Sequence, residues 1–179
     1  MPKATREGGP LLAIDDCYIK IPGCDIIKFN NLPDISDQKS AEYEDAGAIG
    51  RSSPMKTYQH SANRTIGMQI HFIVSGPDDI ENNLNHLRCI ESAVYPREES
   101  GGAPFIPPPI CQLKCGKLLA DTDLCVVLKS YSVKFPTDVS WDANTFIPFK
   151  FDVDTSWDVV YRSSELPGQQ NIIRSGTNG

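Results

Sequence analysis

The clearest periodic pattern in the chain lies between Arg64 and Pro96. Apolar side chains occupy every second position from Ile66 to Val74, and the positions between them carry small or polar side chains such as Gln69 and His71. Strict alternation over this length is typical of a strand with one buried face. We therefore predict a half-buried β-strand in this stretch.

The periodicity changes to that of a helix after Ser75-Gly76. Pro77 suits the first position of a helix, and acidic side chains at Asp78, Asp79 and Glu81 favour the positive end of the helix dipole. Beyond this point the apolar positions form one helical stripe, made by Ile80, Leu84, Leu87, Ile90 and Val94. The pattern predicts a helix over about residues 77–94 that lies on a sheet and ends at Tyr95-Pro96.

Several shorter runs predict further strands. They are Ile14–Ile21, Asp25–Asn30, Ile110–Cys115, Leu124–Phe135, Phe146–Val153 and Ser156–Tyr161. The first two runs meet at Pro22-Gly23, which suits a hairpin turn. Pro148 cannot donate a hydrogen bond to a strand ladder, so an edge or bulge is expected there. The predicted class is mainly β within α+β, with six or seven antiparallel strands, one flanking helix and long loops.

Residues 31–63 show no sustained period and are rich in Pro, Gly, Ser and acidic residues. A connection of this length is uncommon in a compact domain and usually binds something or packs on a partner. We expect this long loop to make assembly contacts. The side chains proposed for them are Asp34, Asp37, Tyr43, Arg51 and Tyr58.

The length of 179 residues suits one domain with a single core. We expect that domain over residues 11–161, between a flexible N-terminal arm (residues 1–10) and a flexible polar tail (residues 162–179) around Ile172–Ile173. No apolar run is long enough to cross a membrane, and the N-terminus lacks the apolar core of a secretory signal. The expectation is a soluble protein synthesised in the cytoplasm.

The formal charge of −6 argues against a general nucleic-acid binder, because such binding needs clustered Lys and Arg. An acidic protein near DNA would instead line a path to which DNA must not adhere. The six cysteines form no Cys-x-x-Cys pair, and Cys111 and Cys115 on one strand would lie about 13 Å apart. We expect buried free thiols at Cys17, Cys24, Cys89, Cys111, Cys115 and Cys125.

The histidines show no catalytic or metal-binding pattern. His60 lies in the long connection, His71 on the polar face of a strand, and His86 away from the helix stripe, so the three are not expected to converge. Cys89 lies on the opposite helix face without a base nearby, which favours an inert thiol over a reactive one.

The remaining acidic and glycine-rich segments also show no catalytic or ligand-binding motif. The acid pairs Asp15-Asp16 and Asp78-Asp79 have structural explanations, and neither a phosphate-binding loop nor a Gly-x-Ser-x-Gly motif occurs. The sequence predicts no catalytic residues, no cofactor and no metal, and therefore a binding or assembly protein rather than an enzyme.

An ordered set of motifs over about residues 24–153 resembles the tube-protein domain of contractile injection systems. These motifs are Phe29-Asn30, Gly50-Arg51 with Pro54, Arg64-Thr65-Ile66, Leu87-Arg88 with Tyr95-Pro96, and the run Pro107, Pro108, Pro109 with Leu113 and Gly116. Their order and spacing, rather than any single motif, carry the resemblance.

The resemblance implies a tail-tube-like fold, a β-sandwich or partly closed barrel that assembles into a ring, with a hexamer as the family expectation. It implies a virion structural protein of a phage contractile tail, assembled in the host cytoplasm, at the junction of tail tube and baseplate. The implied partners are copies of itself and other tube, hub and baseplate proteins, with DNA passing through the lumen without specific binding. Many relatives carry a C-terminal peptidoglycan-binding module, whereas this chain ends in a short polar tail, so the resemblance does not extend to cell-wall binding.

Two other interpretations stay open at this point. A tail terminator or neck ring can share the tube-like fold. A protein of a different class, a small soluble ligand-binding or metal-dependent β-barrel, would use His71, Cys89 or the acidic residues.

Overall fold

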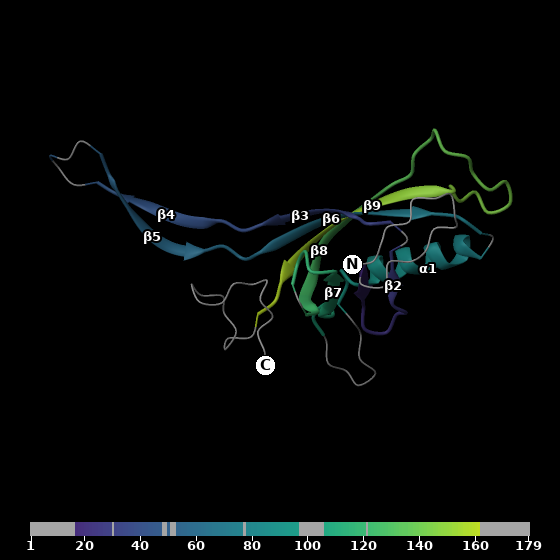
Figure 1. Cartoon of the computed structure of the whole chain (residues 1–179), viewed down its shortest axis with the longest axis horizontal. Coiled ribbons are helices and arrows are strands. Elements are labelled where there is room, and N and C mark those ends of the chain that lie inside the picture. Colours follow the sequence, from purple (N-terminus) through teal and green to yellow (C-terminus); the bar gives the residue numbers. More distant parts are fainter. Residues whose placement is uncertain are drawn as a thin grey trace.

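The computed structural model describes residues 17–29, 31–47, 50, 53–76, 78–96, 106–120 and 122–161. Within these residues the chain forms nine strands and one helix (Figure 1). The strands are β1 (Cys17–Lys20), β2 (Ile27–Lys28), β3 (Asp34–Gln38), β4 (Ala41–Ala46), β5 (Met55–Ser61), β6 (Thr65–Ile73), β7 (Cys111–Cys115), β8 (Leu124–Lys134) and β9 (Lys150–Val159). The helix is α1 (Asp79–Ser92), between β6 and β7.

Seven of these strands form one antiparallel sheet, in the order β2-β1-β7-β8-β9-β6-β3. The predicted mainly-β class with one flanking helix is confirmed. The sheet is open, with β2 and β3 at its edges, and is not closed into a barrel. The predicted hairpin at Pro22-Gly23 joins β1 to β2, where Gly23 has a φ of 86° that favours glycine.

The strand β6 has the alternation that the sequence predicts. It pairs with β9 along its whole length, from Thr65 opposite Asp158 to Ile73 opposite Lys150. One face of this pair is the core, in which the Trp157 side chain is fully buried. Its indole Nε1 donates to Thr155 Oγ1 at 2.8 Å, so the polar group of this large side chain is satisfied inside the core.

The helix α1 lies against the core-facing side of the sheet with Asn83, Leu87 and Ile90 buried. Leu87 and Ile90 belong to the predicted stripe, and Val94 is partly buried and packs against the core. Ile80 and Leu84 are only half-buried, whereas the polar Asn83 is buried, so the stripe was partly wrong. The start of the helix is held by the Asp79 carboxylate, which accepts the backbone N–H groups of Ser75 and Gly76 at 2.9 and 2.8 Å. The predicted role of Pro77 lies outside the described residues. No helix in the described part of the chain has the length and apolar content needed to cross a membrane.

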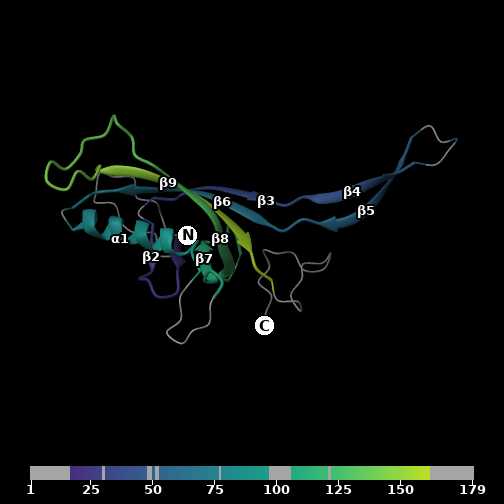
Figure 2. The same cartoon turned by 180° about the vertical axis from the view of Figure 1, so that it is seen from behind.

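The prediction of an irregular loop over residues 31–63 was wrong. This stretch contains β3, which pairs with β6, and the strands β4 and β5, which pair with each other and form a separate two-stranded sheet. Figures 1 and 2 show β4 and β5 projecting well beyond the seven-stranded sheet. Every residue of these two strands is exposed, so neither face needs apolar side chains and the alternation that marks a half-buried strand is missing.

The C-terminal strands also differ from the prediction. Phe146–Val153 and Ser156–Tyr161 were predicted as two strands, but β9 runs unbroken from Lys150 to Val159, and residues 146–149 lie in the loop before it. The polar residues at the predicted break fit one strand. Asp154 lies on the outer face, and buried Thr155 donates to the Met68 carbonyl at 3.0 Å.

The prediction of free thiols was wrong for four cysteines. Disulfides join Cys17 to Cys115 and Cys24 to Cys89. These partners lie 98 and 65 residues apart in sequence and meet only through tertiary structure, since Cys17 and Cys115 are directly opposite in the β1–β7 ladder. Spacing along the chain gives no sign of either pair. Cys125 is a free thiol as predicted, but it is exposed, so its predicted burial was wrong.

Candidate functional site

The two strands β4 and β5, called the ribbon from here on, form the most exposed part of the structure. Tyr43 and Tyr58 are directly opposite each other and pack edge to face, with ring centroids 5.7 Å apart, although each side chain is more than half exposed. Further contacts within the ribbon join polar side chains: Lys56 with Asp45, His60 with Glu42, Gln59 with Glu44, and the Tyr58 hydroxyl with Ser61 Oγ. The ribbon therefore presents two tyrosines and several charges to its surroundings.

The root of the ribbon is held by an ion pair between Arg64 and Asp37. Arg64 is 3% exposed, and its Nε and Nη2 atoms donate to the two carboxylate oxygens of Asp37 at 2.8 and 2.7 Å. Nη2 also donates to the Leu119 carbonyl at 3.0 Å, in the segment between β7 and β8. The hydrogen bond to Asp37 raises the pKa of Arg64, while burial opposes this rise. The pair ties β3 to the start of β6 at the base of the ribbon.

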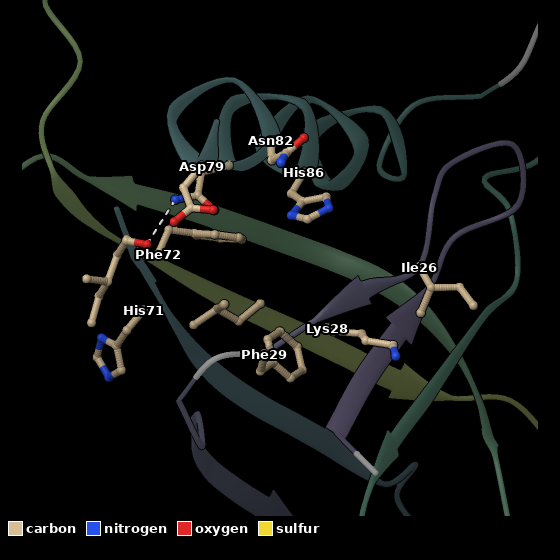
Figure 3. Close-up of a pocket in the computed structure, with 11 residues that line it drawn as sticks. Ile26, Lys28, Phe29, His71, Phe72, Asp79, Asn82 and His86 are labelled. Carbon is tan, nitrogen blue, oxygen red and sulfur yellow. Dashed lines mark hydrogen bonds between the residues drawn. The ribbon is translucent and has the colours of Figure 1, made fainter. Parts of the chain in front are cut away.

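A second feature is a recess of about 340 Å³ at the other end of β6, which we call the seam hollow. Here β6 continues to Ile73, but β3 pairs with it only as far as Gln69. On this side of β6, no described strand pairs with residues 70–73. The recess opens between this edge, β2 and the first half of α1. Figure 3 shows Asp79, Asn82 and His86 reaching from α1 above it, with Ile26 and Lys28 on its β2 side.

The floor of the seam hollow is apolar and its rim is polar. Phe29, Ile70 and Phe72 form the floor and are almost fully buried. Burial lowers the pKa of His86, whose ring lies 6.4 Å from the Phe72 ring, and Asp25 opposes this shift. The volume of the recess is at the lower end of those of ligand sites.

The histidines lie apart, as the sequence predicts. His60 is on the ribbon, whereas the His71 ring points away from α1 and bonds to Asp152 Oδ1 through Nδ1 at 2.6 Å (Figure 3). His86 is at the seam hollow. Among the described residues, no group of three or more His, Cys, Asp or Glu side chains gathers where a metal ion could be held.

The thiol considered as a possible reactive group, Cys89, is bonded to Cys24. A shallow, open recess beside this disulfide is lined by Arg88 and Asp25, among others. The disulfide links α1 to the turn between β1 and β2. Cys89 is therefore part of a cross-link and not the inert thiol that was predicted.

The motif residues are distributed over the whole structure instead of gathering at one site. Phe29, Ile66, Leu87 and Leu113 are core residues, and Thr65 Oγ1 donates to Asp158 Oδ1 at 2.9 Å. Gly50 and Gly116 have positive φ angles of 92° and 52°, which favour glycine. The remaining motif positions are exposed or half-buried: Pro54, Arg88, Tyr95, Pro96, Pro107, Pro108 and Pro109. Asn30 and Arg51 lie outside the described residues. These positions support a framework rather than a reaction centre.

The predicted contact residues of the 31–63 stretch fall into two groups. Tyr43 and Tyr58 lie on the ribbon, and Asp34 has an outward-facing side chain that is 82% exposed. Asp37 instead bonds to Arg64 inside the protein, so its role is internal. The sequence-based prediction missed this ion pair. An arginine next to a half-buried strand, such as Arg64, is a signal for a nearby carboxylate partner.

Comparisons with family models and with curated proteins give no match for this chain.

Proposed function

We propose that this chain is a structural protein of a phage contractile tail and forms a ring where the tail tube meets the baseplate. The observation that carries this proposal is the ribbon. Both strands of the ribbon are exposed at every residue. The ribbon projects from the main sheet beyond the ends of β3 and β6 (Figure 1). The proposal assigns no catalytic role to the chain.

A two-stranded ribbon without a packed face is at best marginally stable in water. The ribbon has side-chain contacts between its own strands but buries none of its residues, so the chain's own core does not stabilise it. Such an element gains stability when a partner covers it. Tyrosines are well suited to this, since they bury a large area at a low cost in conformational entropy.

The open edges of the main sheet support self-assembly. The outer edges of β2 and β3 have no strand partner within the described part of the chain. Unpaired edges are templates for pairing with another chain, and unlike edges on one subunit favour head-to-tail contacts that close into rings. We propose a homo-oligomeric ring, with six copies as the resemblance to tube proteins implies.

The ribbon would then reach a neighbouring copy or the adjoining ring, and the other partners would be tube, hub and baseplate proteins of the virion. The net charge of −6 fits a lumen through which DNA passes without adhering. Assembly would take place in the host cytoplasm.

The structure suggests a clean way to remove the ribbon. The Ala62 backbone N–H donates to the Ser40 carbonyl at 2.9 Å, so the two ends of the ribbon are adjacent. Replacing Ala41–Ser61 by an Asn-Gly turn should therefore leave the pairing of β3 with β6 intact. We expect this variant to keep the thermal midpoint of the parent chain and to lose incorporation into tails. Lys129→Ser, an exposed change on the main sheet, is the control that keeps incorporation.

Normal incorporation of the ribbon-less variant would contradict the proposed role. A pull-down against separate tail proteins distinguishes the baseplate from the neck of the particle. Capture of hub and tube proteins is expected, and capture of neck proteins alone would assign the chain to a terminator or neck ring instead.

A further inference from the structure

The two disulfides differ in their access to solvent. Cys17 and Cys115 are each 1% exposed, and they lie directly opposite each other in the β1–β7 ladder inside the seven-stranded sheet. Cys24 and Cys89 are only half-buried, and they lie on the turn between β1 and β2 and on α1. Of the two disulfides, Cys24–Cys89 is the one that a molecule in solution can approach.

The Cys24–Cys89 disulfide borders the shallow, open recess that Arg88 and Asp25 also line. The other side chains that line this recess are small or polar, namely those of Gly23, Asn85 and Ser92. No bulky apolar group among them blocks the way to the sulfur atoms. Because Arg88 and Asp25 carry opposite charges, access and not charge distinguishes this site.

Contacts other than the disulfide hold both cysteines in place. The Cys24 N–H donates to the Ile21 carbonyl at 3.0 Å across the turn. On α1, the buried side chains of Leu87 and Ile90 flank Cys89 in sequence and anchor this part of the helix on the core. The turn and the helix therefore keep their positions when the disulfide opens, and the two thiols stay close enough to bond again.

Access decides which disulfide reacts, because exchange requires a thiolate to reach a sulfur atom directly. Exposed disulfides are the labile and regulatory ones. The sulfur atoms of Cys17 and Cys115 can be reached only after the sheet opens between β1 and β7, and such local opening of a core element costs free energy. The two bonds are therefore expected to react at very different rates.

We propose that Cys24 and Cys89 form a reversible modification site for small monothiols, while Cys17–Cys115 stays closed. The thiolate of the small thiol attacks one sulfur, forms a mixed disulfide with it, and releases the other cysteine as a thiolate that takes up a proton. A second small thiol attacks the mixed disulfide, leaves as the disulfide of the small thiol, and frees the second cysteine. Two small thiols thus supply the two electrons and two protons that reduce the protein bond.

The site gives the chain two covalent states. In the closed state α1 is tied to the turn between β1 and β2, and in the open state this tie is lost and two thiols are presented to solvent. Disulfides in the cytosol are rare and are usually transient or redox-sensing. With assembly in the host cytoplasm, the open state would prevail during assembly and the closed state after release. This timing rests on the proposed function, whereas the exchange itself does not.

The test incubates the oxidised full chain with reduced glutathione as the small thiol. Samples are taken at intervals, free thiols are blocked with an alkylating reagent, and the modified cysteines are identified by peptide mass spectrometry. Near-ultraviolet circular dichroism, to which the buried Trp157 contributes, reports whether the chain stays folded during the reaction. Cys125→Ser is the matched control, because it removes the exposed free thiol that would otherwise attack the disulfide of another copy.

We expect the Cys24–Cys89 bond to open at least about a hundredfold faster than Cys17–Cys115, a ratio that corresponds to about 2.7 kcal/mol of opening free energy for the buried bond. Glutathione should be found on Cys24 or Cys89, oxidised glutathione should close the bond again, and the circular dichroism should not change. Cys125→Ser should react at the rate of the parent chain.

Equal rates for the two disulfides would overturn the proposal. So would opening that occurs only together with loss of the circular dichroism signal, a bond that does not close again, or a Cys125→Ser variant that fails to react. All of these results concern the purified chain, so they leave the proposed function standing, and the ribbon-less variant tests that function separately.

Discussion

The Arg64 guanidinium and the Asp37 carboxylate form two parallel hydrogen bonds, of 2.8 and 2.7 Å, at the base of the ribbon. Arg64 is almost completely buried, whereas the Asp37 side chain is 26% exposed. The pair joins the strand that enters the ribbon to the strand that follows it. Charge-assisted, bidentate hydrogen bonds of this kind are stronger than neutral ones.

Asp37→Asn should therefore destabilise the protein. The variant leaves the buried Arg64 charge without its counter-ion, and we expect a loss of about 2 kcal/mol in the free energy of unfolding, below the range for fully buried pairs. Asp34→Asn on the same strand is the matched control, because the Asp34 side chain is 82% exposed. It should change stability by less than about 0.5 kcal/mol. Urea titration of both variants measures the difference, and equal effects would show that the pair has no special role.

The hydroxyl of Thr155 bridges two groups in the core. It accepts from the Trp157 indole N–H at 2.8 Å and donates to the Met68 carbonyl at 3.0 Å. Thr155→Val keeps the shape of the side chain but leaves a buried donor unsatisfied, so it should cost about 1–3 kcal/mol. Ser156→Ala, on the outer face of the same strand, should cost much less. The fluorescence-detected unfolding midpoints of the two variants give the comparison.

Reduction of the disulfides should lower stability. The Cys24–Cys89 bond closes a loop across 65 residues and links α1 to the turn between β1 and β2. Its removal by Cys24→Ser with Cys89→Ser should cost about 2–4 kcal/mol under oxidising conditions. The thermal midpoint measured with and without a reductant checks this, with Cys125→Ser, at an exposed free thiol, as the control.

Labelling with an alkylating reagent gives an independent check. Under non-reducing conditions Cys125 should be labelled, while Cys24 and Cys89 should be protected. Labelling of all three at the same rate would contradict the cross-link.

Mild acid should destabilise the protein through His86. Burial lowers the pKa of this imidazole in the folded protein, with a smaller opposing effect of Asp25. The unfolded chain therefore binds a proton at His86 more readily than the folded chain does. The contribution of neutral His86 to folding stability is fully present above the ordinary histidine pKa of about 6.5, and it is lost as the pH falls below that value.

The matched variant for this effect is His86→Gln, which cannot titrate. Between about pH 7.5 and about pH 5.5, on either side of that ordinary pKa, the thermal midpoint of the parent should fall further than that of the variant. A parallel decline in both proteins would assign the pH dependence to other groups.

The sequence predicts β6 and α1 well because each buries one face, and burial imposes a period on the apolar positions. It fails for the ribbon, whose residues are exposed on both faces and obey no such rule. Thr155 misled the prediction of β9 in another way, since its buried hydroxyl donates to the carbonyl of Met68, which lies 87 residues away in sequence.

The candidate sites depend on tertiary structure even more strongly. The seam hollow exists because β3 stops pairing at Gln69 while β6 continues to Ile73, and this difference in strand length is set by the pairing register. The hollow has no local sequence signal. Phe146 was predicted as the first residue of a strand, but the hydrogen bonds of Asp142 to Thr145 and Phe146 place it on a turn, and an Asp at the start of such a turn is a local signal that the prediction did not use.

The central claim, a ring at the junction of tail tube and baseplate, is tested most directly by imaging intact tails that carry a labelled form of this chain. Electron micrographs should show the label in a ring at the tube end that meets the baseplate, in every complete tail. Label at the neck of the particle, or tails that contain none of the chain, would contradict the claim.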